Sequence, residues 1–141
     1  MEMNPYLSFK GDCEAALTFY AQCLGGQIGE IFRYAGSPMA GQVPADWQNK
    51  VMHASITIGT RVLMGADVSL DQYEAPKGFS LSLHMQNPAD AERIFAELGR
   101  NGTVVIPLEK TFWAERFGML VDRFGIPWSI NCEGPGQTPE G

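Results

Sequence analysis

No stretch of this sequence comes near the about 20 consecutive apolar residues that a membrane-spanning helix requires. The first residues also lack the basic region and the apolar core that together mark a secretory signal. These two absences argue against a membrane partner, and they predict a cytoplasmic protein.

Cysteine is scarce, with 3 residues in a chain of 141. Cys13, Cys23 and Cys132 are odd in number and far apart, so they suggest neither a disulfide framework nor a thiolate zinc site. Cys23 falls at an apolar helical position, which favours a place in the core over a role as a nucleophile.

Positive charge is also in short supply. The chain has 10 Lys and Arg residues against 16 Asp and Glu, which gives a net charge of -6 and a pI near 4.8. Such a chain would repel a phosphate backbone, so we expect no nucleic-acid partner. No glycine-rich loop follows a predicted strand, and a Rossmann-like methyltransferase is therefore not indicated.

The sequence does contain a repeated pattern of secondary structure. Residues 5–64 and residues 79–130 both predict a strand, a helix and then further strands. With 45% hydrophobic residues the chain can build one ordinary core, which predicts a single domain over residues 1–133. Its two modules cover about residues 4–67 and 78–133, and a flexible tail follows over residues 134–141.

Each predicted helix has recognisable ends. The first, from about Glu14 to Leu24, is expected to be capped by Asp12 and stopped by two glycines. In the second, Asn87 is the expected cap, Pro88 occupies the first turn, and the helix runs on to about Gly102.

Several predicted strands alternate apolar and polar side chains, which gives each strand one polar face. Residues 51–58 and 79–85 show this pattern, as do Trp128 to Asn131. We expect these polar faces to line a shared space, and we expect residues 35–50 to form a long loop or lid.

Short motifs spread over almost the whole chain resemble one known family. They are Asn4-Pro-Tyr-Leu-Ser-Phe-Lys-Gly11, Phe19-Tyr20 followed by Leu24-Gly25-Gly26, Met52-His53-Ala54, Thr111-Phe-Trp113 with Arg116-Phe-Gly-Met119, and Asp122-Arg-Phe-Gly125-Ile-Pro-Trp128. The family is the PhnB-like branch of the glyoxalase/bleomycin-resistance/extradiol-dioxygenase (vicinal oxygen chelate) superfamily. The resemblance implies an α+β fold, in which two βαβββ modules form a concave eight-stranded half-barrel with the helices on its outer face. It also implies a homodimer.

Enzymes of that superfamily generally hold a divalent metal with His, Gln or Glu on the first strand of each module and Glu on the last strand. The matching positions in this chain carry Pro5 or Tyr6, Phe79 or Ser80, and Ser129. None of these is a strong metal ligand at neutral pH. We therefore expect no cofactor, and a divalent metal at an atypical site is the alternative.

The two histidines, His53 and His84, are the leading candidates for catalysis. Both fall on polar strand faces, and together with a carboxylate such as Glu115 they are also the weak candidates for an atypical metal site. The alternative is a structural histidine that hydrogen-bonds to Ser55, Ser82 or a backbone carbonyl.

Ligand contact is predicted for residues that share these polar faces or lie near the C-terminal motif. They are Tyr6, Ser8, His53, Ser55, Ser82, His84, Trp113, Phe117, Ser129 and Asn131. Phe112 could also roof a pocket, and Trp128 could do so only with the opposite strand phase. The candidate general bases are carboxylates that would need to be buried with a raised pKa, namely Glu30, Asp67, Glu109 and Glu115.

Two functions follow as hypotheses. The first is small-molecule binding in a cavity between the modules, without the usual metal triad. The second is a metal-dependent lyase, isomerase or oxygenase with an atypical site around His53 or His84. Fold-level resemblance does not decide between them.

Overall fold

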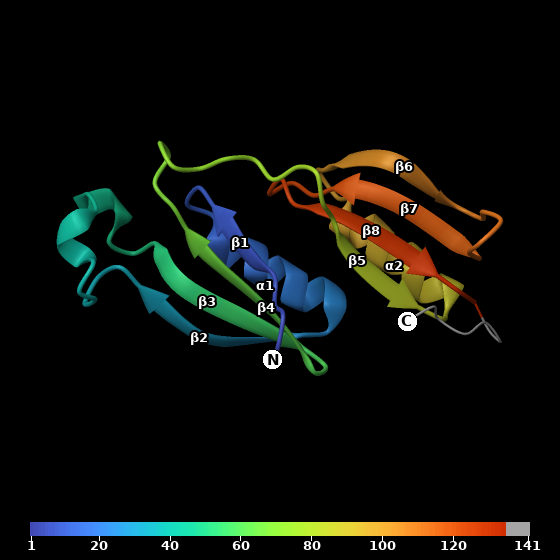
Figure 1. Cartoon of the computed structure of the whole chain (residues 1–141), viewed down its shortest axis with the longest axis horizontal. Coiled ribbons are helices and arrows are strands. Elements are labelled where there is room, and N and C mark those ends of the chain that lie inside the picture. Colours follow the sequence, from blue (N-terminus) through green and yellow to red (C-terminus); the bar gives the residue numbers. More distant parts are fainter. Residues whose placement is uncertain (135–141) are drawn as a thin grey trace. The chain divides into compact units, whose positions relative to one another are not determined.

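The computed structural model describes residues 1–134, which divide into two compact units, with the second beginning at Ala75. The first unit consists of β1 (Tyr6–Phe9), α1 (Cys13–Leu24), β2 (Gln27–Arg33), two 3-10 turns η1 (Ala40–Gln42) and η2 (Ala45–Trp47), β3 (Val51–Ile58) and β4 (Arg61–Asp67). The second consists of β5 (Leu81–Met85), α2 (Pro88–Leu98), β6 (Thr103–Glu109), β7 (Arg116–Val121) and β8 (Pro127–Cys132). Each unit is a βαβββ module (Figure 1), which confirms the predicted α+β fold class.

The two sheets have the same strand order. Sheet A is β1-β4-β3-β2 and sheet B is β5-β8-β7-β6. In each sheet the first strand pairs in parallel with the last, and the other pairings are antiparallel. A parallel pair needs a long crossover connection, and the helix together with the next two strands supplies it.

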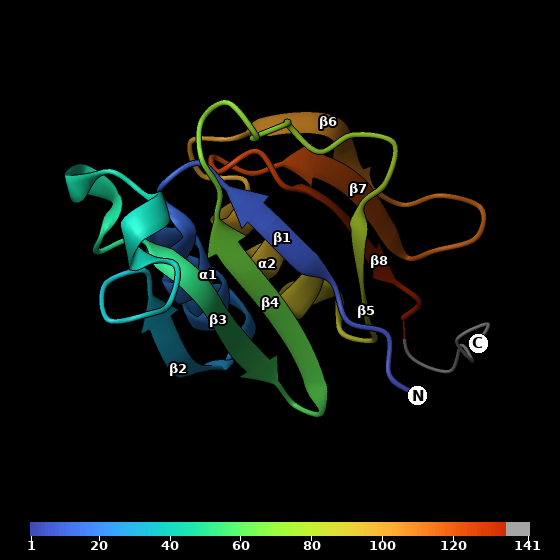
Figure 2. The ribbon, with the colours of Figure 1, turned by 60° about the vertical axis from the view of Figure 1, so that its left-hand side comes forward.

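Sheet A buries one face against α1, which lies behind the sheet in both ribbon views (Figures 1 and 2). The buried side chains alternate along the strands and come from the apolar positions of the sequence, namely Leu7, Phe9, Ala54, Ile56 and Leu63, with Ala16, Leu17 and Tyr20 from the helix. The alternate residues His53, Ser55 and Thr57 face the other side. The predicted division of β3 into an apolar and a polar face is therefore confirmed.

A bulge near the start of β3 changes this alternation. Phe32 pairs with His53, whereas the next residue, Arg33, pairs with Val51, so β3 has one extra residue at Met52. As a result Val51 is buried at 1% exposure, and Arg33 reaches Glu14 on α1. Simple alternation would have put Val51 on the polar face with His53.

The ends of α2 only partly match the expectation. The Asn87 side chain accepts a hydrogen bond from the Ala89 N–H, and Pro88 opens the helix, as predicted. The helix ends at Leu98, however, and not near Gly102. Gly102 is needed for another reason, because a Cβ there would collide with the backbone oxygen of Val121 on the neighbouring strand.

Two other boundaries differ from the predictions. Strand β5 starts at Leu81, whereas the predicted strand started at Phe79. Phe79 lies outside the sheet and is 52% exposed. The predicted loop over residues 35–50 contains the two 3-10 turns, and the Gln48 amide braces it by donating to the carbonyls of Ala40 and Val43.

Residues 135–141, which make up nearly all of the predicted tail, lie outside the described residues. Within residues 1–134, neither helix has the length and apolar character needed to cross a membrane.

Candidate functional site

In the first unit, the polar face of sheet A carries a cluster of aromatic rings around His53. The Tyr6 hydroxyl lies 3.1 Å from His53 Nδ1, and the Tyr6 and Phe32 ring centroids lie 5.6 and 6.3 Å from the imidazole. Tyr6 and Phe32 are large aromatic residues, yet they are 51% and 46% exposed. We call Tyr6, Phe32 and His53 the His53 cluster.

The hydrogen bond from Tyr6 decides which polar groups this cluster can offer. When the phenol donates to Nδ1, the imidazole carries its proton on Nε2, which has no hydrogen-bond partner within residues 1–134. Burial raises the pKa of the Tyr6 phenol, with the charge at Cys13 as the second cause, so the hydroxyl stays protonated at neutral pH. In this tautomer the cluster presents the Nε2–H of His53 as a donor between two exposed aromatic rings.

The two predicted serines of this unit lie on the same face of sheet A as His53. Ser8 pairs with Ala66, and Ser55 pairs with Met64, which is also the partner of Tyr6. Ser8 is exposed and Ser55 is partly buried. The structure thus brings four of the predicted ligand-contact residues, Tyr6, Ser8, His53 and Ser55, onto one surface.

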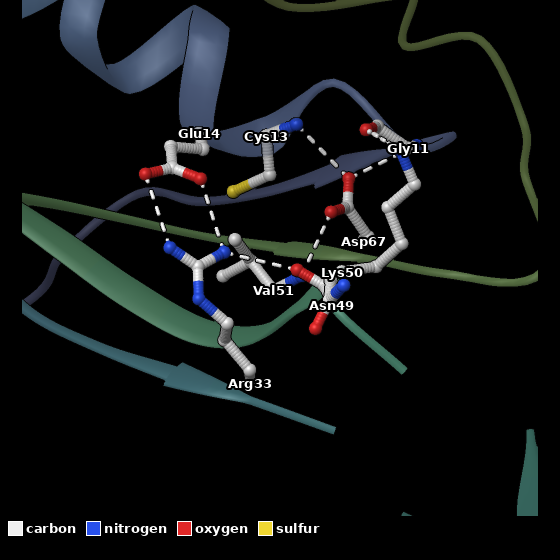
Figure 3. Close-up of polar contacts among 8 residues, drawn as sticks. All are labelled: Gly11, Cys13, Glu14, Arg33, Asn49, Lys50, Val51 and Asp67. Carbon is white, nitrogen blue, oxygen red and sulfur yellow. Dashed lines mark hydrogen bonds and ion pairs between the residues drawn. The ribbon is translucent and has the colours of Figure 1, made fainter. Parts of the chain in front are cut away.

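Asp67, a candidate general base, has a structural role instead. It is 1% exposed, and its two oxygens accept the backbone N–H groups of Gly11, Cys13 and Val51, each at 2.9 Å (Figure 3). Both oxygens are engaged by the backbone, so the carboxylate is not positioned to take a proton from a ligand. Asp67 also supplies the first-turn acceptor of α1 that was predicted for Asp12, whose side chain makes no capping bond.

Cys13, next to Asp67, is not a nucleophile. Its side chain is fully buried, and burial, followed by the charge of Asp67, raises the pKa of the thiol well above its ordinary value. Cys23 and Cys132 are also buried, at 4% and 0% exposure. The polar groups near Cys13 hold segments of the fold together (Figure 3). Among them, Arg33 on β2 donates to both carboxylate oxygens of Glu14 on α1, at 3.0 and 3.1 Å.

In the second unit, sheet B carries a hydrogen-bonded chain of side chains on its polar face. Ser82 Oγ lies 3.0 Å from His84 Nε2, and His84 Nδ1 lies 3.0 Å from Glu133 Oε1. Asn131 Nδ2 donates to the same Glu133 oxygen at 2.9 Å. Both ring nitrogens of His84 are thus engaged, whereas His53 uses only one. We call Ser82, His84, Glu133 and Asn131 the His84 network.

Glu133 is a residue of this network that the sequence did not single out, because the predicted domain ends at Glu133 and no strand was expected to reach it. Strand alternation from Asn131 would have put Glu133 on the same face as His84. Glu133 is 8% exposed as a residue. Burial raises the pKa of its carboxyl, but hydrogen bonds from His84, its own backbone and Asn131 outweigh that effect and lower the pKa below its ordinary value. Glu133 therefore stays ionised at neutral pH.

An aromatic pair lies beside this network. Phe117 is the register partner of Asn131, which in turn pairs with His84, so the three residues form one row across sheet B. The Trp113 ring packs edge-on against Phe117 at 5.3 Å and is 50% exposed. The predicted ligand contacts of Trp113 and Phe117 stay predictions.

Other predicted residues have different surroundings. Phe112 is 98% exposed and contacts the edge of Trp113, so it does not roof a described cavity. Trp128 is 2% exposed and donates its indole N–H to Asp122, which places it in the core. Ser129 lies on the polar face beside Ser82 but is 7% exposed.

The remaining carboxylates do not assemble around either histidine. Glu30 and Glu109 are exposed, and Glu115 pairs with Arg116 at 3.4 Å. In the part of the chain that is described, no group of three or more His, Cys, Asp or Glu residues could hold a metal ion.

The residues of this chain at the superfamily's usual metal-ligand positions are not suited to a divalent metal either. Tyr6 is a neutral phenol bonded to His53, and Phe79 and Ser80 precede β5. Ser129, at the last position, offers only a hydroxyl. These positions supply no carboxylate, thiolate or imidazole.

The sequence matches a known family model and a known protein over most of its length. Residues 2–130 match the model of the Glyoxalase/Bleomycin resistance protein/Dioxygenase superfamily. The chain is 32% identical over 139 residues to the protein YjdN of Escherichia coli (strain K12), covering 93% of this chain and 95% of YjdN.

Solved structures give the same result. The protein PA1353 of Pseudomonas aeruginosa is 43% identical, with a TM-score of 0.86 over 95% of this chain and 98% of PA1353. A PhnB protein of Bacillus cereus superposes with a TM-score of 0.80 over 94% of this chain and 99% of its own; its 22% identity supports the fold alone.

Proposed function

Because this chain belongs to the glyoxalase/bleomycin resistance protein/dioxygenase superfamily, we propose that it binds a small molecule at the polar face of sheet A. One observation carries the proposal. The exposed rings of Tyr6 and Phe32 flank His53, and the Nε2 atom of this histidine has no hydrogen-bond partner within residues 1–134. Exposed rings of this size are stabilised when a ligand covers them, and the N–H between them gives the ligand a fixed orientation.

The geometry favours a planar ligand that carries an oxygen acceptor. Its ring would stack on Tyr6 or Phe32, and its oxygen would accept the N–H of His53 Nε2. Ser8 and Ser55 on the same face would provide further hydroxyl groups for a second polar substituent. Aromatic carboxylates and phenols have this chemistry.

We expect His53→Ala to weaken binding of such a ligand about tenfold, because one hydrogen bond to the ligand contributes roughly 0.5–1.5 kcal/mol and the alanine also removes the imidazole ring between Tyr6 and Phe32. Tyr6→Phe keeps the ring but removes the bond that fixes the imidazole, so its effect should be smaller. The measurement is an NMR titration with a panel of benzoates and phenols, following the signals of Phe32, which lies in the same cluster and is present in every variant.

Thr57→Ala is the matched control. Thr57 is exposed on the same face of β3, four residues from His53 and so roughly 13 Å along the strand. Equal affinity of the wild type and His53→Ala for every ligand that binds would contradict the proposal. Elemental analysis of the untagged protein before the titration tests the alternative, since near-stoichiometric metal would support a metal-dependent lyase, isomerase or dioxygenase.

We also propose that the protein forms a homodimer and that a second copy covers β6. This strand is at the edge of sheet B, and Val104, Val105 and Ile106 are 50%, 58% and 42% exposed. An uncovered apolar edge strand promotes uncontrolled association, which a specific partner prevents. Val105→Lys should convert the dimer to a monomer, as measured by light scattering after size exclusion. The control is Gln86→Lys, which places a lysine at an exposed position outside β6 and should leave the dimer intact. A monomeric wild type would refute the idea.

A further inference from the structure

The His84 network has the parts of a nucleophilic site. Ser82 Oγ is 3.0 Å from His84 Nε2, and Glu133 Oε1 is 3.0 Å from the opposite ring nitrogen. We propose that Ser82 is a nucleophile that attacks small carboxylic esters, with His84 as its base and Glu133 as the group that orients His84. A serine within hydrogen-bond reach of a histidine that a carboxylate holds from behind is the arrangement that activates a hydroxyl. The proposal rests on the second unit alone and does not depend on binding at the His53 cluster.

The contacts of Glu133 select the tautomer of His84 that this chemistry needs. A carboxylate can only accept, so Nδ1 must carry the ring proton and donate it to Glu133. Nε2 is then the lone-pair nitrogen, and it accepts the hydroxyl proton of Ser82. Asn131 fixes the carboxylate by donating to the same oxygen at 2.9 Å. The negative charge of Glu133 would stabilise the imidazolium that forms when Ser82 reacts.

Both reacting groups are accessible. Ser82 is exposed, and the His84 side chain is 55% exposed, whereas the Glu133 side chain behind it is 10% exposed. A substrate could therefore reach Ser82 and His84 from solvent. Glu133 stays buried, where it can hold the imidazole in place.

The backbone of β5 supplies a donor for the negative charge that develops on the ester oxygen. The Glu133 N–H bonds to the Met85 carbonyl, so Met85 and its alternate residues direct their backbone groups towards β8. The N–H of Ser82 therefore points to the opposite side of β5, which is the edge of sheet B. An N–H of the nucleophile itself is a common oxyanion donor.

The neighbouring side chains indicate the class of ester. Phe117 lies in the same row as His84 and Asn131, and Trp113 packs against it while 50% exposed. An apolar wall of this kind suits an aromatic or short alkyl group on the substrate. We therefore expect uncharged esters with one such group.

The reaction balances with water as the only co-reactant. The Ser82 oxygen bonds to the acyl carbon while its proton passes to His84 Nε2, and the ester C–O bond breaks as the alcohol leaves with that proton. Water then attacks the acyl carbon and gives a proton to His84. The carboxylic acid leaves, and Ser82 regains its proton from His84.

Two probes test the proposal. A biotinylated fluorophosphonate should form an O–P bond on Ser82 with loss of fluoride, and mass spectrometry of the peptide that contains Ser82 identifies the site. Hydrolysis of p-nitrophenyl acetate measures turnover. We expect Ser82→Ala to abolish the label, and His84→Ala to slow labelling by about 100-fold or more, as the loss of a general base does.

Glu133→Gln separates orientation from structure, because glutamine can still accept from His84 but has no charge. It should slow labelling about tenfold or more while leaving the thermal unfolding midpoint near that of the wild type. Ser69→Ala, a serine outside both sheets, should label at Ser82 as the wild type does. Folded wild type that stays unlabelled at Ser82, or equal labelling rates in the wild type and His84→Ala, would overturn the proposal.

Discussion

Replacing Asp67 with alanine is expected to lower the free energy of unfolding by about 3 kcal/mol or more. The carboxylate accepts three backbone N–H groups at 2.9 Å, from Gly11, Cys13 and Val51. Alanine would leave these donors without their acceptor in a region where Cys13 and Val51 are 0% and 1% exposed. Each unsatisfied buried donor costs roughly 1–3 kcal/mol.

Asp67 joins three segments that are distant in the sequence. Asp67 is the last residue of β4. Its carboxylate oxygens accept hydrogen bonds from the turn after β1, from the first turn of α1 and from the start of β3. Urea denaturation followed by circular dichroism measures the loss. Asp67→Asn should fall between wild type and alanine, because an amide keeps one acceptor oxygen but points N–H groups at the remaining donors.

The control for this measurement is Asp12→Ala. Asp12 occupies the N-cap position of the same helix, where a side-chain acceptor typically contributes about 1 kcal/mol, but it makes no capping bond here. We expect a change within about 0.5 kcal/mol. A large loss in Asp12→Ala together with a small loss in Asp67→Ala would show that the cap is local after all.

The pair Asp12 and Asp67 shows what the sequence could predict and what it could not. Helix boundaries follow from local signals, so the first helix was placed to within one residue, starting at Cys13 where Glu14 was expected. The identity of the cap depends on a contact across 54 residues, from Cys13 to Asp67, which no local pattern encodes. The same reason explains Val51, whose burial follows from a bulge that is visible only in the pairing of β2 with β3.

The candidate sites divide along the same line. Strand alternation placed His53, Ser55, Ser82 and His84 on polar faces, because side-chain direction in a strand is a local property. The partners of the histidines were not predictable. Tyr6 reaches His53 across 47 residues and Glu133 reaches His84 across 49 residues, and both contacts depend on sheet register. Whether any of these residues contacts a ligand stays a prediction.

In the second unit, Asp122→Ala is expected to cost about 3 kcal/mol, because this carboxylate holds both a turn and a core tryptophan. One oxygen accepts the N–H groups of Phe124 and Ile126 at 2.8 and 3.1 Å, and the other accepts the indole N–H of Trp128 at 2.8 Å. The sequence motif predicted the turn, in which Gly125 adopts a φ of 88°, but it did not predict the bond to the indole.

Tryptophan fluorescence can separate these two roles of Asp122. In a background of Trp47→Phe and Trp113→Phe, emission reports on Trp128 alone, which is 2% exposed in the wild type. Asp122→Ala should shift that emission to longer wavelength in the native state as well as lower the urea midpoint, whereas Arg123→Ala, on an exposed neighbour in the same turn, should do neither. If Asp122→Ala lowers the midpoint and leaves the emission unchanged, the turn alone accounts for the stabilisation, and the bond to Trp128 contributes nothing to holding the indole in place.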